Sequence, residues 1–156
     1  MAARAIVGIA LGMLFLPVIV LFLDGSFWGW ITSITVNFNV FLNTYLVFGA
    51  TTLTIPLITL FGPALNLSTF LFVYAVPMVA WAIIGMWAGA IERSAGRGIG
   101  VAVGVWLGWL IIELIMLAIE GFIALFLNLL IEQWFSVVIA IIFAAIIGAV
   151  TKSEEF

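Results

Sequence analysis

The sequence predicts an all-α integral membrane protein with four transmembrane helices. Of its 156 residues, 67% are hydrophobic and only 7% are charged, whereas about a quarter are charged in a typical soluble domain. Its apolar runs reach the roughly 20 residues that cross about 30 Å of hydrocarbon. The stretches between these runs leave no room for a separate soluble domain. We therefore expect a single membrane domain over residues 1–156.

Charged and turn-forming residues bound the predicted spans. The first follows Arg4 and ends before Asp24, and the third ends before Glu120. The predicted spans cover residues 5–23, 70–91, 99–119 and 134–150. Residues 122–131 make a short apolar run between two glutamates, and we expect them to form a separate interfacial helix.

Residues 27–69 are ambiguous. Apolar and polar residues alternate from Ile34 to Val40, which is a period typical of a strand. An isolated strand cannot cross lipid, because its backbone would lack hydrogen bonds. The segment is therefore expected to lie outside the membrane, to be buried against protein, or to belong to a helix with a polar face. The region as a whole is interfacial, outer-side or re-entrant, or it adds two further spans and gives six.

The basic residues predict the orientation of the chain. Four spans place all of them on one face of the membrane: Arg4, Arg93, Arg97 and Lys152. Basic residues favour the cytoplasmic side. We therefore expect a multi-pass protein of the cell membrane with both termini in the cytoplasm. Arg93 and Arg97 are expected to lie among anionic head groups as topology anchors.

Glycines on both sides of the charged loop 92–98 predict a tightly packed hairpin. Gly85 and Gly89 precede this loop, and Gly100, Gly104 and Gly108 follow it. Glycine at every fourth residue leaves bare backbone along one side of a helix, so that another helix can approach closely. If the chain folds back about residues 94 and 95, Gly89 meets Gly100 and Gly85 meets Gly104. Packing between copies of the chain is the alternative. The last span also has a stripe of small residues: Ala140, Ala144 and Gly148.

Glu113 is the ionisable residue that lies deepest in a predicted span. A buried charge there costs at least a few kcal/mol, so its carboxyl should be protonated, hydrated or paired. At about 100° per residue Glu113 points away from Gly104 and shares a helix face with three other residues: Trp106, Trp109 and Glu120. We expect this face to contact a partner or an ion, or to fix the packing of helices within the chain.

The absence of cysteine and histidine excludes several kinds of chemistry. The chain cannot form a disulfide, and it lacks the usual ligands of haem, iron–sulfur, zinc and copper sites. It also lacks the residues of Ser-His-Asp and Cys-His catalysis. We expect no catalytic residue, metal or cofactor. A net charge of −3 does not favour nucleic-acid binding.

These observations favour a non-catalytic structural or accessory subunit of a multisubunit membrane complex. Its expected partners are the lipid bilayer and other membrane subunits, and a second copy of the chain is possible. The alternative is a small channel, or a proton- or cation-coupled transporter, that uses Glu113.

Overall fold

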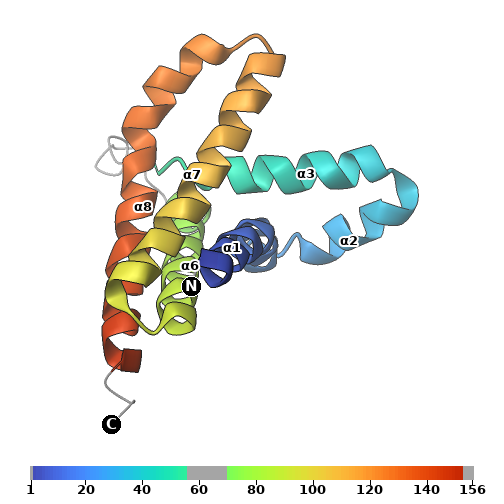
Figure 1. The fold of residues 1–156 in the computed structure, drawn as a ribbon. Helices are drawn as coiled ribbons and strands as arrows, with labels where there is room; N and C mark the ends of the chain where they lie inside the picture. Colours follow the sequence, from blue (N-terminus) through green and yellow to red (C-terminus); the bar gives the residue numbers. More distant parts are fainter. Residues whose placement is uncertain (1, 56–69, 153–156) are drawn as a thin grey trace.

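The computed structural model describes residues 2–55 and 70–152, which are helical and contain no strand (Figure 1). Four of its helices are long and apolar enough to cross a membrane: Ala3–Leu23, Val73–Glu92, Ala95–Ile119 and Glu132–Lys152. The predicted all-α class is therefore confirmed for the described residues. Four such helices are consistent with a multi-pass membrane protein.

The first of the long helices is α1 (Ala2–Leu23). A π-helical segment, η1 (Phe70–Ala75), leads into α6 (Val76–Glu92). Pro77 lies in the first turn of α6, where the missing N–H of proline is tolerated. A turn at Arg93 and Ser94 then leads into α7 (Ala95–Ile119).

The last helix, α8 (Ile123–Lys152), is continuous over 30 residues. The predicted division between an interfacial helix at 122–131 and a span at 134–150 is therefore not present. Glu132 and Gln133 interrupt the apolar pattern of the sequence, but both residue types are good helix formers. Proline is absent from the helix, and its one glycine, Gly148, lies near the end.

Residues 27–55 form two short helices and a connecting segment. The helices are α2 (Phe27–Val36) and α3 (Phe38–Thr51), so the alternating stretch is helical except at Asn37. Asn37 between them has an extended backbone, and its side chain accepts hydrogen bonds from the N–H groups of Asn39 and Val40 at the start of α3. With 10 and 14 residues, these helices rise about 15 and 21 Å and cannot cross the bilayer alone. The rest of the ambiguous region, 56–69, lies outside the described residues.

The long helices form one group, and α2 and α3 project from its side as an arm (Figure 1). Within the group, α1 lies against α7: the backbone at Gly8 faces Val101, and that at Gly12 faces Val105. The arm is joined to α6 because Trp81 Nε1 donates a hydrogen bond to the carbonyl of Thr52 over 2.8 Å. Trp81 is fully buried and is among the largest side chains of the core.

Candidate functional site

Glu113 is buried inside the chain, between α7 and α8. Its side chain is 8% exposed, and Gln133 Nε2 on α8 donates a hydrogen bond to Glu113 Oε2. Gln133 is itself fully buried, and its Oε1 has no partner within the part of the chain that is described. The carboxyl is therefore paired with a neutral amide, and no basic side chain is involved in this contact.

Trp106 extends this polar contact along the interface of α7 and α8. Its Nε1 lies 3.1 Å from Ser136 Oγ and 3.3 Å from the carbonyl of Gln133, and it donates to both. Ser136 is fully buried and donates to the same carbonyl over 2.7 Å. A cluster of four residues, Trp106, Glu113, Gln133 and Ser136, thus joins α7 to α8.

The other two residues predicted on this helix face lie elsewhere. Trp109 is 1% exposed and points towards α1 and α3, where its Nε1 donates to the carbonyl of Met13 over 3.2 Å. Glu120 is exposed at the end of α7. Trp109 and Glu113 are therefore covered by this chain itself, and their side chains do not form an outer surface for a partner.

Gly85 and Gly89 pack against α8, and Gly89 also meets the start of α7. A Cβ atom at Gly85 would lie 2.3 Å from the carbonyl oxygen of Ala140, and one at Gly89 would lie 2.6 Å from that of Ala144. Both are backbone contacts, so the two helix backbones touch directly. The partner of these glycines is the small-residue stripe of the last span.

The predicted glycine pairs across the α6–α7 turn are therefore wrong. Gly89 meets Gly98, where a Cβ would lie 2.9 Å from Gly89 Cα, while a Cβ at Gly100 would have nothing within 4 Å. The physical reason is the register of the turn. Gly89 meets the residue nine positions later in the chain, whereas the predicted partner lies eleven positions later. Two residues correspond to about 200° of helix rotation. Gly104 and Gly108 consequently face α1, against Ile9 and Met13.

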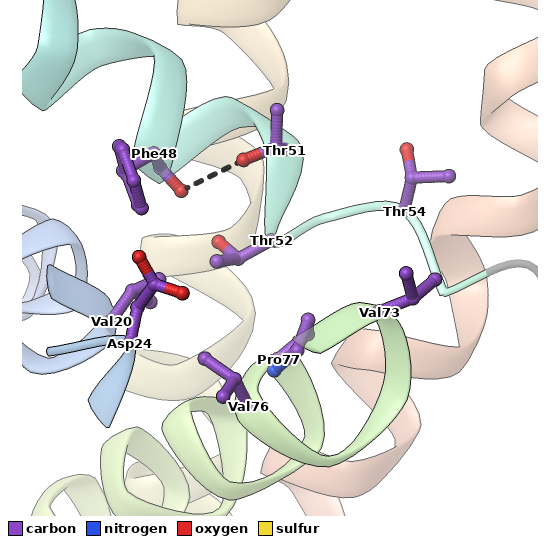
Figure 2. Close-up of a pocket in the computed structure, with 9 residues that line it drawn as sticks. All are labelled: Val20, Asp24, Phe48, Thr51, Thr52, Thr54, Val73, Val76 and Pro77. Atoms are coloured by element: carbon purple, nitrogen blue, oxygen red, sulfur yellow. Dashed lines mark hydrogen bonds between the residues drawn. The ribbon is translucent and has the colours of Figure 1, made fainter. Parts of the chain in front are cut away.

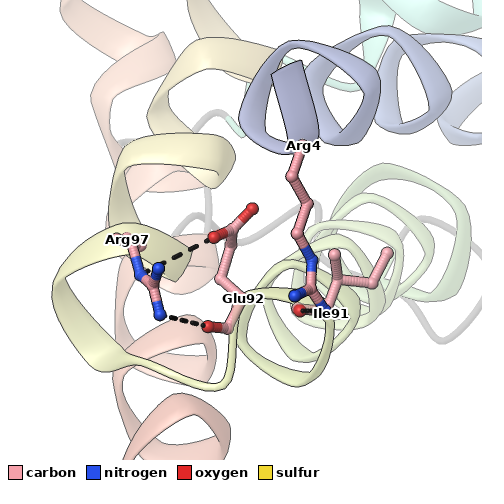
Figure 3. A network of polar contacts seen from close by, with 4 residues as sticks. All are labelled: Arg4, Ile91, Glu92 and Arg97. Atoms are coloured by element: carbon pink, nitrogen blue, oxygen red, sulfur yellow. Dashed lines mark hydrogen bonds and ion pairs between the residues drawn. The ribbon is translucent and has the colours of Figure 1, made fainter. Parts of the chain in front are cut away.

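The four basic residues lie at one end of the helix group. The Arg4 guanidinium donates to the carbonyl of Ile91, at the end of α6 (Figure 3). A Cβ at Gly148, one turn before Lys152, would lie 2.7 Å from the backbone of Ser94. The start of α1 and the end of α8 therefore both lie beside the α6–α7 turn.

Arg97 contacts Glu92 at this basic end. Its Nε lies 3.8 Å from Glu92 Oε2, and its Nη2 donates to the Glu92 carbonyl over 3.2 Å (Figure 3). Glu92 is 3% exposed, and its Oε1 has no partner among the described residues. Arg93 adopts the left-handed conformation (φ 46°) that ends α6, with its N–H bonded to the carbonyl of Gly89. The expected head-group contacts of both arginines remain predictions.

Stacked aromatic rings stiffen the arm and attach it to the helix group. The ring of Trp30 on α2 stacks on that of Phe41 on α3, with centroids 4.5 Å apart, and also on that of Tyr45. Tyr45 in turn packs against Trp109 of α7 and donates a hydrogen bond to the carbonyl of Leu14 over 2.8 Å. The arm is thus a preorganised element.

The polar groups of the arm fall into two sets. The hydroxyls of α2 are satisfied internally: Thr32 donates to the carbonyl of Gly29, and Thr35 to that of Thr32. Asn39 and Asn43, one turn apart on α3, are both exposed, and neither side-chain amide has a hydrogen bond to a described residue. The arm carries no charged residue. Its surface is therefore apolar apart from the hydroxyls of α2 and α3, the capping residue and the free amides.

Sequence reasoning missed three residues that make structural contacts: Gln133, Gly98 and Glu92. Gln133 was missed because the sequence predicts a break between residues 131 and 134, whereas in the structure Gln133 lies within α8 and contacts Glu113. The contact of Gly98 with Gly89 can be predicted only from the register of the α6–α7 turn, and glycine spacing alone does not give that register.

No protein-family model, no curated protein and no solved structure matches this chain.

Proposed function

We propose that this protein is a non-catalytic accessory subunit of a membrane complex, and that it contacts its partner through the α2–α3 arm. The free amides of Asn39 and Asn43 are the observation that carries this proposal. An amide without a partner is costly in an apolar environment, and asparagines of this kind join helices in membranes. Because the arm has no charge, the partner surface is a membrane helix with neutral polar groups.

The rest of the arm supports this role. Its aromatic stack fixes the positions of α2 and α3 before binding, which lowers the entropy cost of association. Trp28 and Val36 on α2 are 74% and 86% exposed, so the arm also presents large apolar side chains.

The experiment compares two double variants after extraction of the complex in a mild detergent. Asn39→Leu with Asn43→Leu removes the free amides, whereas Thr32→Val with Thr35→Val makes a similar polar-to-apolar change at hydroxyls that are already bonded. We expect the wild type and the threonine variant to co-purify with a membrane partner at fixed stoichiometry. We expect the asparagine variant to lose about 30-fold in affinity, from two contacts of about 1 kcal/mol each.

A wild-type protein that is monomeric in native-lipid particles, or equal retention of the partner by both variants, would contradict the proposal. Native mass spectrometry of the complex distinguishes a second copy of this chain from another subunit. We also propose that the basic end faces the cytoplasm of the cell, because its four Lys and Arg residues follow the positive-inside rule.

The second candidate is proton or cation transport through Glu113. The buried contact with Gln133 favours it, because Gln133 Oε1 lacks a partner among the described residues and is free to accept a donor or a cation. Proteoliposomes of the purified chain would then carry a proton or cation flux that Glu113→Gln abolishes. The absence of any flux in the wild type would exclude this candidate.

A further inference from the structure

A pocket of about 240 Å³ lies where α1, α3 and α6 meet. Figure 2 shows Val20 and Asp24 from the end of α1 on one side, and the start of α6 below. The remaining wall comes from Val73 of η1 and from α3 and the segment after it: Phe48, Thr51, Thr52 and Thr54. A single water needs only about 10–15 Å³ by this kind of measure. The pocket therefore has room for a molecule of several heavy atoms.

The polar groups of the pocket are mainly hydrogen-bond acceptors. The Asp24 carboxylate points into the space between Phe48 and Thr52 in Figure 2. Ser26 Oγ donates to Asp24 Oδ2 over 2.6 Å, which fixes the carboxylate and leaves Oδ1 without a partner in the described structure. Thr52 donates its own proton to the carbonyl of Gly49, so its oxygen still has lone pairs. The Thr54 hydroxyl makes no hydrogen bond to a described residue.

The charge distribution around the pocket favours a cation. Both α1 and α3 end beside it, at Leu23 and Thr51, and a helix C-terminus carries about half a negative charge. Asp24 adds a full carboxylate. The basic residues of the chain lie at the opposite end of the helix group, so none of them lines the pocket.

The walls select the kind of cation. Calcium and magnesium ions take six or more oxygen ligands, often including carboxylates, and the described residues contain no group of three His, Cys, Asp or Glu side chains that could hold a metal. Val20, Val76 and Pro77 instead offer apolar surface, and Phe48 offers an aromatic ring of the kind that attracts ammonium groups. We propose that this pocket binds a substituted ammonium ion, either a free small amine or the head group of an aminophospholipid.

Calorimetric titration of the full chain in maltoside detergent tests the proposal, with ethylammonium and tetramethylammonium as probes. We expect saturable binding of at least one probe, unaffected by sodium chloride at the same concentration. Asp24→Asn should weaken this binding at least tenfold, and Thr54→Val severalfold. Glu132→Gln is the matched control, because it removes a carboxylate outside the pocket, and it should bind as the wild type does.

No saturable binding of either probe, equal competition by sodium, or unchanged affinity in Asp24→Asn and Thr54→Val would overturn the proposal. Nanodiscs identify the source of the ammonium group. If phosphatidylethanolamine blocks the probe and phosphatidylglycerol does not, the ligand is a lipid head group. If the probe binds in both lipids, the ligand is a free amine. These outcomes do not depend on whether the arm binds a partner.

Discussion

Replacing Gly85 by alanine tests the direct contact between α6 and α8. The new Cβ would lie 2.3 Å from the carbonyl oxygen of Ala140 and 3.0 Å from its Cα. Ordinary van der Waals contact begins near 3.4 Å, so the helices must separate locally by about 1 Å. Overpacking of this kind costs about 1–3 kcal/mol, while the better helix propensity of alanine returns at most about 1 kcal/mol. We therefore expect a net destabilisation of up to about 2 kcal/mol.

Gly100→Ala is the matched control in the adjacent helix. A Cβ there has no neighbour within 4 Å, so we expect unchanged stability or a gain of up to about 1 kcal/mol. Reversible unfolding in mixed micelles of increasing SDS content, followed by circular dichroism, gives the free energy of unfolding for each variant. The two variants should differ by at least about 1 kcal/mol.

The contact atoms make the test more specific. Because Gly85 faces a backbone carbonyl, the additional change Ala140→Gly should not restore the stability of Gly85→Ala. A hairpin in which Gly89 faces Gly100 predicts the opposite pattern. Loss of stability in Gly100→Ala, equal to or larger than that in Gly85→Ala, would refute the arrangement of α6, α7 and α8 described here.

Three further predictions follow from other contacts. Gln133→Leu leaves the Glu113 carboxyl without its donor and should lower the free energy of unfolding in SDS by about 1–3 kcal/mol; an unchanged value would argue against that contact. Burial raises the pKa of Tyr45 from 10.0 to about 12, so its absorbance titration in Tyr74→Phe, which leaves one tyrosine, should have a midpoint near 12. Because the folded state then holds the proton more tightly, stability falls as pH rises from 10 to 12, whereas a midpoint at 10 would contradict the burial. In this cysteine-free chain, a thiol introduced by Gly96→Cys, at an exposed site, should react with an impermeant maleimide only from the cytoplasmic side, and labelling from outside would reverse the proposed orientation.

The sequence predicts the helical class and the four spans well because both depend on the length and hydropathy of single segments. Contacts between segments are harder to predict from the sequence, since they depend on the register of the turns. The pairing of Gly89 with Gly100 assumed a turn centred between residues 94 and 95, and the observed turn pairs Gly89 with Gly98. A difference of two residues rotates a helix by about 200°, so the face points in nearly the opposite direction.

The candidate site was predictable only in part, for a similar physical reason. The helical angles correctly separate Glu113, which faces α8, from Gly104 and Gly108, which both face α1. They could not place Trp109, whose long side chain reaches α1 and α3. They also missed Gln133, because the last helix was expected to begin after it.

Crosslinking from the tip of the arm in intact membranes tests the central proposal most directly. A photoreactive phenylalanine analogue at Val36, which is 86% exposed, is compared with the same analogue at Ile142 on the surface of α8, which is 49% exposed. If the arm binds a partner helix, position 36 gives a protein adduct of one defined mass, and position 142 gives lipid adducts. Lipid adducts alone at both positions would contradict the proposal that this arm joins a membrane complex.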